Sequence, residues 1–155
     1  MIRLRVERTI AAPPDEVFDW LVVPSNLTAS RLVFTCRWVK GSSGPGVGAV
    51  RAATAVGIWL RERIVAYDPP RSYSYLIVRS FPPMVHDGGT LTFAPSADST
   101  HVEWVTTYTI PKYAGGKMTE AVSAVLIRAG FSGILAGCAK ALEPSGNLRY
   151  HQRSW

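Results

Sequence analysis

The chain has 155 residues, of which 47% are hydrophobic and only 18% are charged, and its formal net charge is +6. This length is enough for one domain with an ordinary hydrophobic core, and the composition excludes an intrinsically disordered chain. The positive charges are spread along the sequence and form no strong cluster. We therefore expect no nucleic-acid partner, because such a partner requires a concentrated basic surface.

The chain contains two cysteines, Cys36 and Cys138, which lack the spacing of a metal site. We expect both to be buried thiols in a reducing cytoplasm, with a disulfide as the lesser possibility. The N-terminus MIRLRVERTI does not resemble a signal sequence. No later run is uninterruptedly apolar over the ~18 residues that a membrane-spanning helix needs. We therefore expect a cytoplasmic protein without an integral membrane segment.

The first two elements are a strand and a short helix. Residues 2–10 begin by alternating apolar and charged side chains, which is the period of a strand covered on one side. The stretch that follows, AAPPDEVFDWLV, places Pro13 and Pro14 where a helix begins and acidic residues in its first turn. This helix should end before Pro24.

The middle of the chain predicts a succession of strands. Stretches rich in alternating, β-branched and aromatic residues, separated by turn residues, cover 31–39, 49–56, 58–67, 72–79, 90–94 and 101–110. With the first strand they make roughly seven strands at hairpin spacing. This spacing favours an antiparallel meander over a parallel sheet with crossover helices.

The stretch 116–142 predicts a long apolar helix. Its first half carries one apolar face, which we expect to point at the sheet and which is formed by Met118, Val122, Val125, Leu126 and Ala129. Beyond Gly130 and Gly133 the apolar positions move to nearly the opposite side, where they are Phe131, Ile134, Leu135, Cys138 and Leu142. This change predicts either a bend at the glycines or a second apolar face for a partner, such as a second copy in a homodimer.

Several segments carry a resemblance to a known family. They are APPDEVFDWL after the first strand, RERIVAYDPPRSYSY in the middle, and DGGTLTF followed by STHVEWVTTYTIP before the last helix. Together they make the chain similar to the SRPBCC superfamily of START-like domains, above all to its bacterial polyketide cyclase/dehydrase and lipid-transport group. The resemblance covers residues 1–143 and leaves a tail, 144–155, outside the domain.

This resemblance implies an α+β helix-grip fold. In such a fold a curved antiparallel sheet of about seven strands wraps around a long C-terminal helix, with a short helix after the first strand. The resemblance also implies a cavity between the sheet and the long helix. Physical reasoning agrees, because a bent sheet and a helix cannot close tightly along their whole length unless bulky side chains fill the gap.

Aromatic side chains on the predicted strands are candidates for the cavity wall. Trp104 and Tyr108 share a strand face with small hydroxyl side chains, an arrangement that suits a flat, partly polar ligand but is equally typical of plain core packing. Phe34, Trp38 and Phe93 would line the cavity or pack just behind it. The full candidate ligand-binding set is Phe34, Trp38, Trp59, Arg63, Phe93, Trp104, Tyr108, Met118, Val122 and Val125.

The strand at 58–67 has two possible orientations. Its apolar alternation would carry Glu62 into the cavity, where it could act as a base, although a surface carboxylate paired with a neighbouring arginine is the plainer interpretation. The resemblance implies instead that Arg63, which looks like the pocket arginine of aromatic polyketide cyclases, faces inward together with Trp59. Neighbouring residues point to opposite faces, so only one orientation can hold without a bulge. We expect Arg63 to face inward.

The three histidines predict no catalytic or metal site. His86 falls in a predicted loop, His101 begins a strand and His151 lies in the tail. No spacing among them indicates a metal or a triad, so we expect all three to be exposed and predict no metal and no cofactor.

The connection between the predicted strands at 72–79 and 90–94 is unusually apolar. It contains the run 81–85, and Gly88 and Gly89 follow as a possible hinge. The resemblance implies a position near the cavity mouth. The run is either a lid that touches an apolar ligand or a segment that packs on the end of the helix.

Three functions are compatible with these patterns. The leading interpretation is a protein that binds a small hydrophobic or aromatic ligand, lipid-like or polyketide-like, in the cavity. The resemblance also allows an enzyme, a polyketide cyclase/dehydrase-type lyase or aromatase in which Arg63 stabilises an enolate and Tyr108 or a water relays a proton. A third possibility is a protein-interaction module that uses the second apolar face of the long helix.

Overall fold

The computed structural model describes residues 1–42 and 44–144. In chain order the elements are β1 (Ile2–Ile10), α1 (Pro14–Val22), the 3-10 helix η1 (Pro24–Ala29), β2 (Val33–Trp38), β3 (Val50–Ala55), β4 (Ile58–Asp68), β5 (Ser72–Phe81), β6 (Val85–Ser96), β7 (Ser99–Thr109), the 3-10 helix η2 (Lys112–Ala114) and α2 (Gly116–Leu142).

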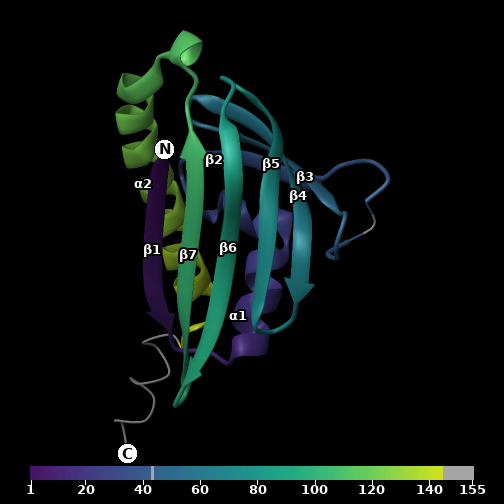
Figure 1. Ribbon diagram of the computed structural model, residues 1–155. Coiled ribbons are helices and arrows are strands. Elements are labelled where there is room, and N and C mark those ends of the chain that lie inside the picture. The colour runs from purple at the N-terminus through teal and green to yellow at the C-terminus, as the bar shows by residue number, and fades with distance from the viewer. Residues whose placement is uncertain (43, 145–155) are drawn as a thin grey trace, which may run out of the picture.

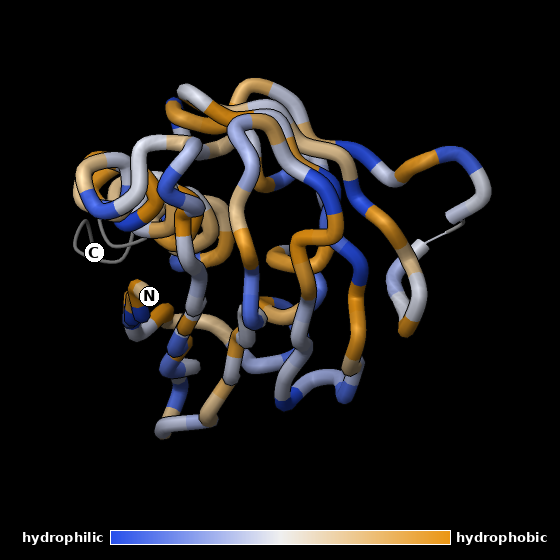
Figure 2. The backbone as a smooth tube through the Cα atoms, turned by 45° about the horizontal axis from the view of Figure 1, so that its top comes forward, coloured by the Kyte–Doolittle hydropathy of each residue, from blue (hydrophilic) through white to orange (hydrophobic). Residues whose placement is uncertain are grey.

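The seven strands form one antiparallel sheet in the order β1-β7-β6-β5-β4-β3-β2. From β2 to β7, strands that follow one another in the chain are neighbours in the sheet, and β1 joins the far edge beside β7. Figure 1 shows α2 running behind β1 and β7. Figure 2 shows the sheet curling around an interior, with hydrophobic and hydrophilic residues alternating along the strands. The predicted α+β helix-grip fold is confirmed.

The strand β7 shows why the sheet has one buried face. Its residues alternate between buried and partly exposed along the whole strand. Val102, Trp104, Thr106 and Tyr108 all point inward, as the two-residue period requires. These residues therefore lie on the buried face of the sheet, which is the side that faces the helices.

The short helix α1 closes the far end of the sheet. Pro14 occupies its first turn together with Asp15 and Glu16, which suits the positive end of the helix dipole. Phe18 is fully buried, and its ring packs edge-on against the rings of Tyr73 and Phe93 at centroid distances of 5.7 and 5.1 Å. This aromatic cluster fills the interior at the α1 end.

A β-bulge changes the predicted facing of β2. The pairing of β2 with β3 shifts between Val33 and Thr35, so that Phe34 is the extra residue. Phe34 is consequently 61% exposed, whereas Cys36 is buried. The simple alternation expected for this stretch was wrong at Phe34, because a bulge moves one residue out of phase with its neighbours.

The long helix α2 continues without interruption through Gly130 and Gly133. The predicted facing of its two halves was largely wrong, although Leu126 of the predicted first-half face does point at the sheet. In the first half Met118, Val122 and Val125 are 79%, 59% and 69% exposed. In the second half the residues predicted to turn away belong to the core or pack against it, namely Phe131, Ile134, Leu135, Cys138 and Leu142.

Two glycines allow α2 to lie close to η1. A Cβ atom on Gly133 would sit 2.7 Å from Oγ of Ser30, and one on Gly137 would sit 2.5 Å from Cβ of Ala29. Neither position therefore has room for a side chain. Gly133 is thus a packing residue, and the change of apolar face along α2 reflects which side the core occupies.

α2 also meets the length and composition criteria for a helix that crosses a membrane. Its mean hydropathy reaches 1.7 over an 18-residue window, of which 22% is buried. Core helices of globular proteins meet the same criteria, so the match alone is weak. In this structure α2 packs along β1 and η1. Glu120, which belongs to α2, accepts a hydrogen bond through its carboxylate from the backbone N–H of Ile110.

The connection between β5 and β6 is shorter than predicted. β5 extends to Phe81 and β6 begins at Val85, so Gly88 and Gly89 lie within a strand and form no loop hinge. A Cβ atom on Gly89 would come within 2.2 Å of the Tyr75 ring. Gly89 therefore lets the Tyr75 ring lie directly against the backbone of β6.

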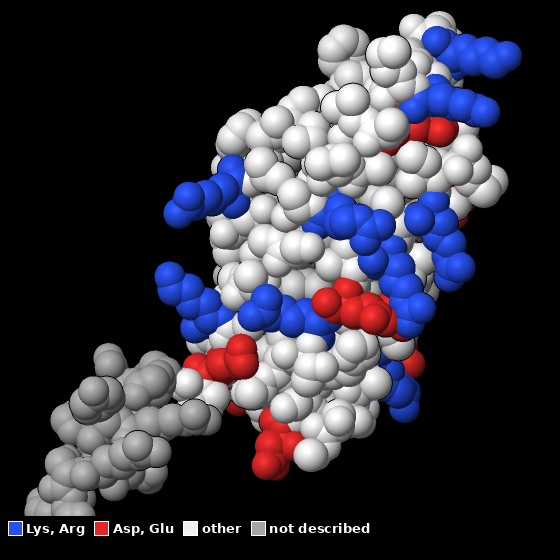
Figure 3. All heavy atoms as spheres, turned by 90° about the vertical axis from the view of Figure 1, so that its left-hand side faces the viewer, with Lys and Arg blue, Asp and Glu red and all other residues white. Residues whose placement is uncertain are grey.

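Charged side chains are dispersed on the surface. Figure 3 shows Lys and Arg spaced over the face that carries β1 and α2, with acidic groups between them. Arg5 of β1 lies 3.1 Å from Glu103 of β7 and also pairs with Glu7. The positive charge visible on this face is thus not concentrated in one basic surface.

Candidate functional site

The interior contains two adjoining hollow compartments between the sheet and α2. The first compartment has a volume of about 120 Å³ and the second about 210 Å³. Four residues line both compartments, namely Val56, Ile58, Leu126 and Ile127. For scale, a well-studied apolar cavity of about 150 Å³ is large enough to bind benzene. The space is therefore suited to a small ring compound.

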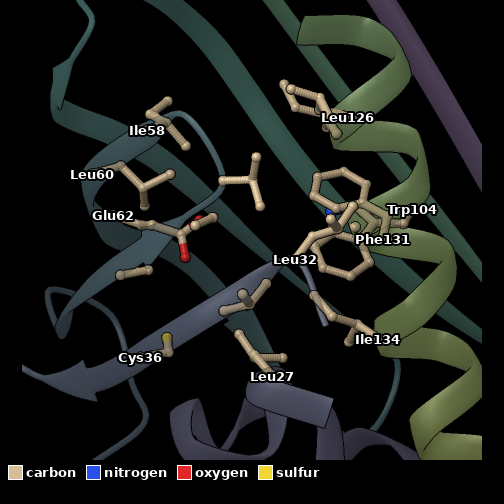
Figure 4. A pocket seen from close by; sticks show the side chains of 16 residues that line it. Leu27, Leu32, Cys36, Ile58, Leu60, Glu62, Trp104, Leu126, Phe131 and Ile134 are labelled. Carbon is tan, nitrogen blue, oxygen red and sulfur yellow. The ribbon is translucent and has the colours of Figure 1, made fainter. Parts of the chain in front are cut away.

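The first compartment is walled almost entirely by carbon. Its sixteen lining residues come from η1, the adjoining segment that leads into β2, the strands β2, β3, β4 and β7, the β3–β4 turn, and α2. Glu62 is the only charged side chain among them, and Figure 4 shows its carboxylate among hydrocarbon side chains. Trp104 and Phe131 form the opposite wall, with ring centroids 3.7 Å apart and nearly parallel planes. An apolar ligand here would meet one anionic group.

Glu62 is held by an arginine that lies directly opposite it on the next strand. The register of β3 and β4 pairs Arg51 with Glu62. The distance from Nη2 of Arg51 to Oε1 of Glu62 is 3.1 Å, and the Arg51 side chain is only 1% exposed. Burial is the largest single influence and disfavours the guanidinium charge, but the Glu62 carboxylate, together with Tyr73 and Cys36, raises the pKa of Arg51 above its ordinary value. The two groups form a buried ion pair.

Aromatic rings surround the rest of the guanidinium. Its central carbon lies 5.6 Å from the Tyr73 ring centre and 5.9 Å from that of Tyr75. These contacts favour the positive charge through the ring quadrupoles. The Nε and Nη1 atoms of Arg51 have no hydrogen-bond partner among the described residues. Arg51 itself does not line the first compartment, so Glu62 separates it from the hollow space.

The tyrosines of β5 tie this polar region to the rest of the interior. The hydroxyl of Tyr73 donates a hydrogen bond to the backbone oxygen of Leu21 in α1. The hydroxyl of Tyr75 accepts one from Nε1 of Trp104, at 2.8 Å. Burial raises the pKa of both tyrosines, so both remain neutral phenols. Trp104 is thus fixed in place as a wall of the cavity.

His86 is buried, contrary to the exposed loop position that we predicted for it. It lies in β6, its Nδ1 accepts a hydrogen bond from the backbone N–H of Ile77, and its Nε2 lies 2.8 Å from Oγ1 of Thr106. An accepting Nδ1 places the proton of the neutral ring on Nε2, which then donates to Thr106. Burial lowers the pKa of His86 to about 4, so the ring is neutral at physiological pH.

The two cysteines are free and buried, in agreement with the prediction. Cys36 lines the first compartment. Burial raises the pKa of Cys36 to about 11 and that of Cys138 to about 12, so neither is a thiolate at neutral pH. Among the described residues no group of three or more His, Cys, Asp or Glu side chains could hold a metal ion.

The orientation of β4 is opposite to the one we expected. Ile58, Leu60 and Glu62 line the first compartment. Arg63 is exposed on the outer face, so its predicted place in the cavity was wrong. Trp59 also faces outward, where its ring lies beneath the guanidinium groups of Arg61 and Arg79.

The other predicted aromatic residues fall into three places. Trp104 lines the first compartment, whereas Phe93 and Trp38 pack in or against the core without lining either compartment. The hydroxyls of Tyr108 and Ser123 are hydrogen bonded at 2.7 Å, which attaches β7 to α2 beside the second compartment. The exposed Phe34 lines neither compartment.

The predicted wall on α2 is only partly present. Val122 lines the second compartment at its rim, whereas Met118 and Val125 line neither compartment and are largely exposed. The helix residues that line both compartments are instead Leu126 and Ile127. The predicted face therefore lay too far around the helix, because α2 presents the neighbouring positions to the sheet.

The apolar connection between β5 and β6 lies at the second compartment. Pro82 and Met84 line it, whereas Phe81 is 74% exposed. This position agrees with the expected place near a cavity mouth. Whether the segment moves as a lid stays a prediction.

Sequence reasoning missed Arg51. This residue lies in the small-residue strand VRAATA, where a lone charge resembles an outward-facing one. The inward position of Glu62, by contrast, was indicated by the apolar alternation of β4. A buried Glu62 needs a cationic partner, and a neighbouring strand is the natural source of one. The apolar alternation of β4 was therefore the signal that could have led to Arg51.

The sequence model of a family described as polyketide cyclase / dehydrase and lipid transport matches residues 1–143. No curated protein matches the chain.

Solved structures show the same fold. TTHA0849 of Thermus thermophilus has a TM-score of 0.72 and 22% identity, over 90% of this chain and 95% of its own. CV1439 of Chromobacterium violaceum has a TM-score of 0.68 and 21% identity, over 94% and 100%. The major latex-like protein 151 of Panax ginseng has a TM-score of 0.69 and 15% identity, over 92% and 98%. At these identities the likeness concerns the fold alone.

Proposed function

Because the chain belongs to the polyketide cyclase/dehydrase and lipid-transport family, we propose that it binds a small hydrophobic or aromatic ligand between its sheet and α2. The observation that carries this proposal is the pair of adjoining compartments, of about 120 and 210 Å³, with almost wholly apolar walls. Ligand pockets are typically such apolar spaces with a few placed polar groups.

The arrangement of the walls supports binding over simple imperfect packing. The first compartment has an aromatic wall, made by the mutually stacked rings of Trp104 and Phe131, opposite a single anionic group, Glu62. Trp104 is fixed by its hydrogen bond to Tyr75. A preformed wall of this kind reduces the ordering that binding would otherwise require.

The enzyme alternative loses the residue on which it was based. A cyclase mechanism with Arg63 as the enolate-stabilising group requires that guanidinium to be in the cavity, and Arg63 is exposed on the outer face of β4. Tyr108 is engaged with Ser123. The geometry therefore favours binding as the function to test first.

The interaction-module alternative also changes its surface. The apolar positions predicted to meet a partner, such as Ile134 and Leu135, are in the core. The exposed apolar side chains of α2 are instead Met118, Val122 and Val125, which any homodimer built on this helix would have to cover.

Both cysteines are buried free thiols, which supports a reducing cytoplasm as the location.

A direct test is binding of the neutral fluorescent probe N-phenyl-1-naphthylamine to the full chain. We expect one bound probe per chain. Ala53 lines the first compartment, so Ala53→Leu should fill part of it and weaken binding by about tenfold or more, which corresponds to about 1.4 kcal/mol. Ala52 precedes it on the same strand and points the other way, so Ala52→Leu is the matched control.

The thermal unfolding temperature of both variants should be measured alongside binding. A stable Ala53→Leu variant with weakened binding supports the proposal. Equal affinities of the two variants, or no binding by the wild-type chain, would overturn it.

A further inference from the structure

We infer that the ligand of the first compartment is a neutral ring compound with a hydroxyl group, and that this hydroxyl donates a hydrogen bond to the Glu62 carboxylate. This inference is based on the proposed binding function and specifies its ligand class. It excludes fatty acids and other carboxylates as the preferred ligands.

The first compartment offers a ligand very few polar groups. Of the residues that line the first compartment, Glu62 alone is charged. Of the other polar atoms there, Nε1 of Trp104 already donates to Tyr75, and the neutral thiol of Cys36 is only a weak donor and acceptor. The Arg51 side chain is 1% exposed and lies outside the lining, so its guanidinium cannot meet the ligand. Recognition of a polar group in this compartment therefore falls to a carboxylate, which only accepts hydrogen bonds.

The Glu62 carboxylate can accept further hydrogen bonds. Oε1 of Glu62 lies 3.1 Å from Nη2 of Arg51. Among residues 1–42 and 44–144 no other group is found to donate a hydrogen bond to this carboxylate. An ionised carboxylate has room for about four donors. The oxygen that does not face Arg51 is thus available to a donor in the cavity, where the carboxylate points in Figure 4.

The net charge of the Arg51–Glu62 pair limits the charge that a ligand can carry. Arg51 and Glu62 together are neutral, and the surrounding wall is apolar. A ligand carboxylate would place a second negative charge against Glu62, and a ligand ammonium would leave the site with an uncompensated positive charge. A neutral hydroxyl adds no charge and forms a charge-assisted hydrogen bond, which is stronger than a bond between neutral groups.

The size and walls of the compartment limit the shape of the apolar part of the ligand. Trp104 and Phe131 line the compartment with aromatic carbon, and its volume of about 120 Å³ is close to that of a cavity that accepts benzene. A second ring can extend past Leu126 and Ile127, which line both compartments. A fused two-ring phenol therefore matches the space and the single acceptor.

The test compares three probes that share one fused ring system: naphthalene, 2-naphthol and 2-naphthoate. Their dissociation constants for the full chain are measured by calorimetry at pH 7. We expect 2-naphthol to bind about tenfold more tightly than naphthalene, and 2-naphthoate to bind more weakly than both. Because removal of Glu62 alone leaves Arg51 unpaired, the informative variant is the double substitution Arg51→Met with Glu62→Leu. It should keep naphthalene binding and lose the preference for 2-naphthol.

A matched control is Glu103→Gln, which changes a carboxylate on the outer face and should keep the preference. If the wild-type chain binds naphthalene without preferring 2-naphthol, or prefers 2-naphthoate, this inference is wrong while the proposed function stands. A preference that survives in the double variant also overturns it. If no probe binds, the proposed function fails and this inference fails with it.

Discussion

The two halves of α2 border very different interiors. The second half is tightly packed towards its end: Leu135, Cys138 and Ala139 are 1%, 0% and 2% exposed, and two glycines bring the helix against η1. The first half faces hollow space, since Leu126 and Ile127 line both compartments, and the wall of the first compartment continues along the helix to Ile134. The same helix therefore contributes to the stability of the fold at one end and encloses a cavity at the other.

This difference follows from what lies opposite each half. The second half faces η1 and the core side chains of α1, which reach into the interior. The first half faces β3, the β3–β4 turn and the start of β4, which offer mostly small or medium side chains such as Ala53 and Ala55. Small residues across a curved sheet leave volume unfilled. Packed and hollow regions should respond differently to the same kind of substitution.

The largest expected effect concerns the ion pair beside the hollow region. Glu62→Leu leaves the buried Arg51 without its partner and should lower the free energy of unfolding by about 3–5 kcal/mol. Adding Arg51→Met should recover most of this loss, because an apolar pair of similar volume needs no counter-charge. Urea denaturation measures both. The exposed Glu103→Leu should cost less than about 1 kcal/mol, and an equal cost at the two sites would contradict the buried pair.

Truncating leucines in the two halves of α2 tests the comparison itself. Leu135→Ala creates a new void in a packed region and should lower the free energy of unfolding by about 2–5 kcal/mol. Leu126→Ala only enlarges a space that already exists and should cost about half as much or less. Denaturant titration of both variants gives the ratio. Equal losses would mean that the first half is packed as tightly as the second.

His86 predicts a dependence of stability on pH. Its pKa is lowered to about 4 in the folded protein, whereas an unfolded histidine titrates near 6.5. Below pH 6.5 the unfolded chain therefore binds more protons than the folded chain, so stability falls with pH until about pH 4. The loss from this residue should be roughly 2–3 kcal/mol. In His86→Gln the difference in stability between pH 7 and pH 4.5 should shrink, and an unchanged difference would contradict the assignment.

The smallest effects separate the glycines of α2. Gly137→Ala should lower the free energy of unfolding by about 1–3 kcal/mol, because its Cβ would meet Ala29 at 2.5 Å. A Cβ on Gly130 meets nothing within 4 Å, so Gly130→Ala should raise that free energy by about 0.4–1 kcal/mol. Thermal unfolding shows the opposite signs. Two changes of the same sign would mean that neither contact decides the outcome.

The candidate site was predicted less well than the fold. Apolar alternation in β4 indicated an inward Glu62, but the family resemblance favoured Arg63, and the structure follows the alternation. Phe34 was misplaced because no sequence pattern marked the bulge between Val33 and Thr35. The buried His86 was mistaken for a loop residue because Gly88 and Gly89 resemble a turn. Each error arose where a local pattern had two geometric solutions.

By itself the sequence indicated most of the elements, the antiparallel succession of the strands and the family, because periodicity and turn residues act over short distances. Only the tertiary structure decided which faces are inside. The pairing of Arg51 with Glu62 depends on the register between two strands, and the contrast between the two halves of α2 depends on what lies opposite them. A cavity is volume that distant segments leave unfilled, so it is specified by the assembled fold and by no single stretch of the chain.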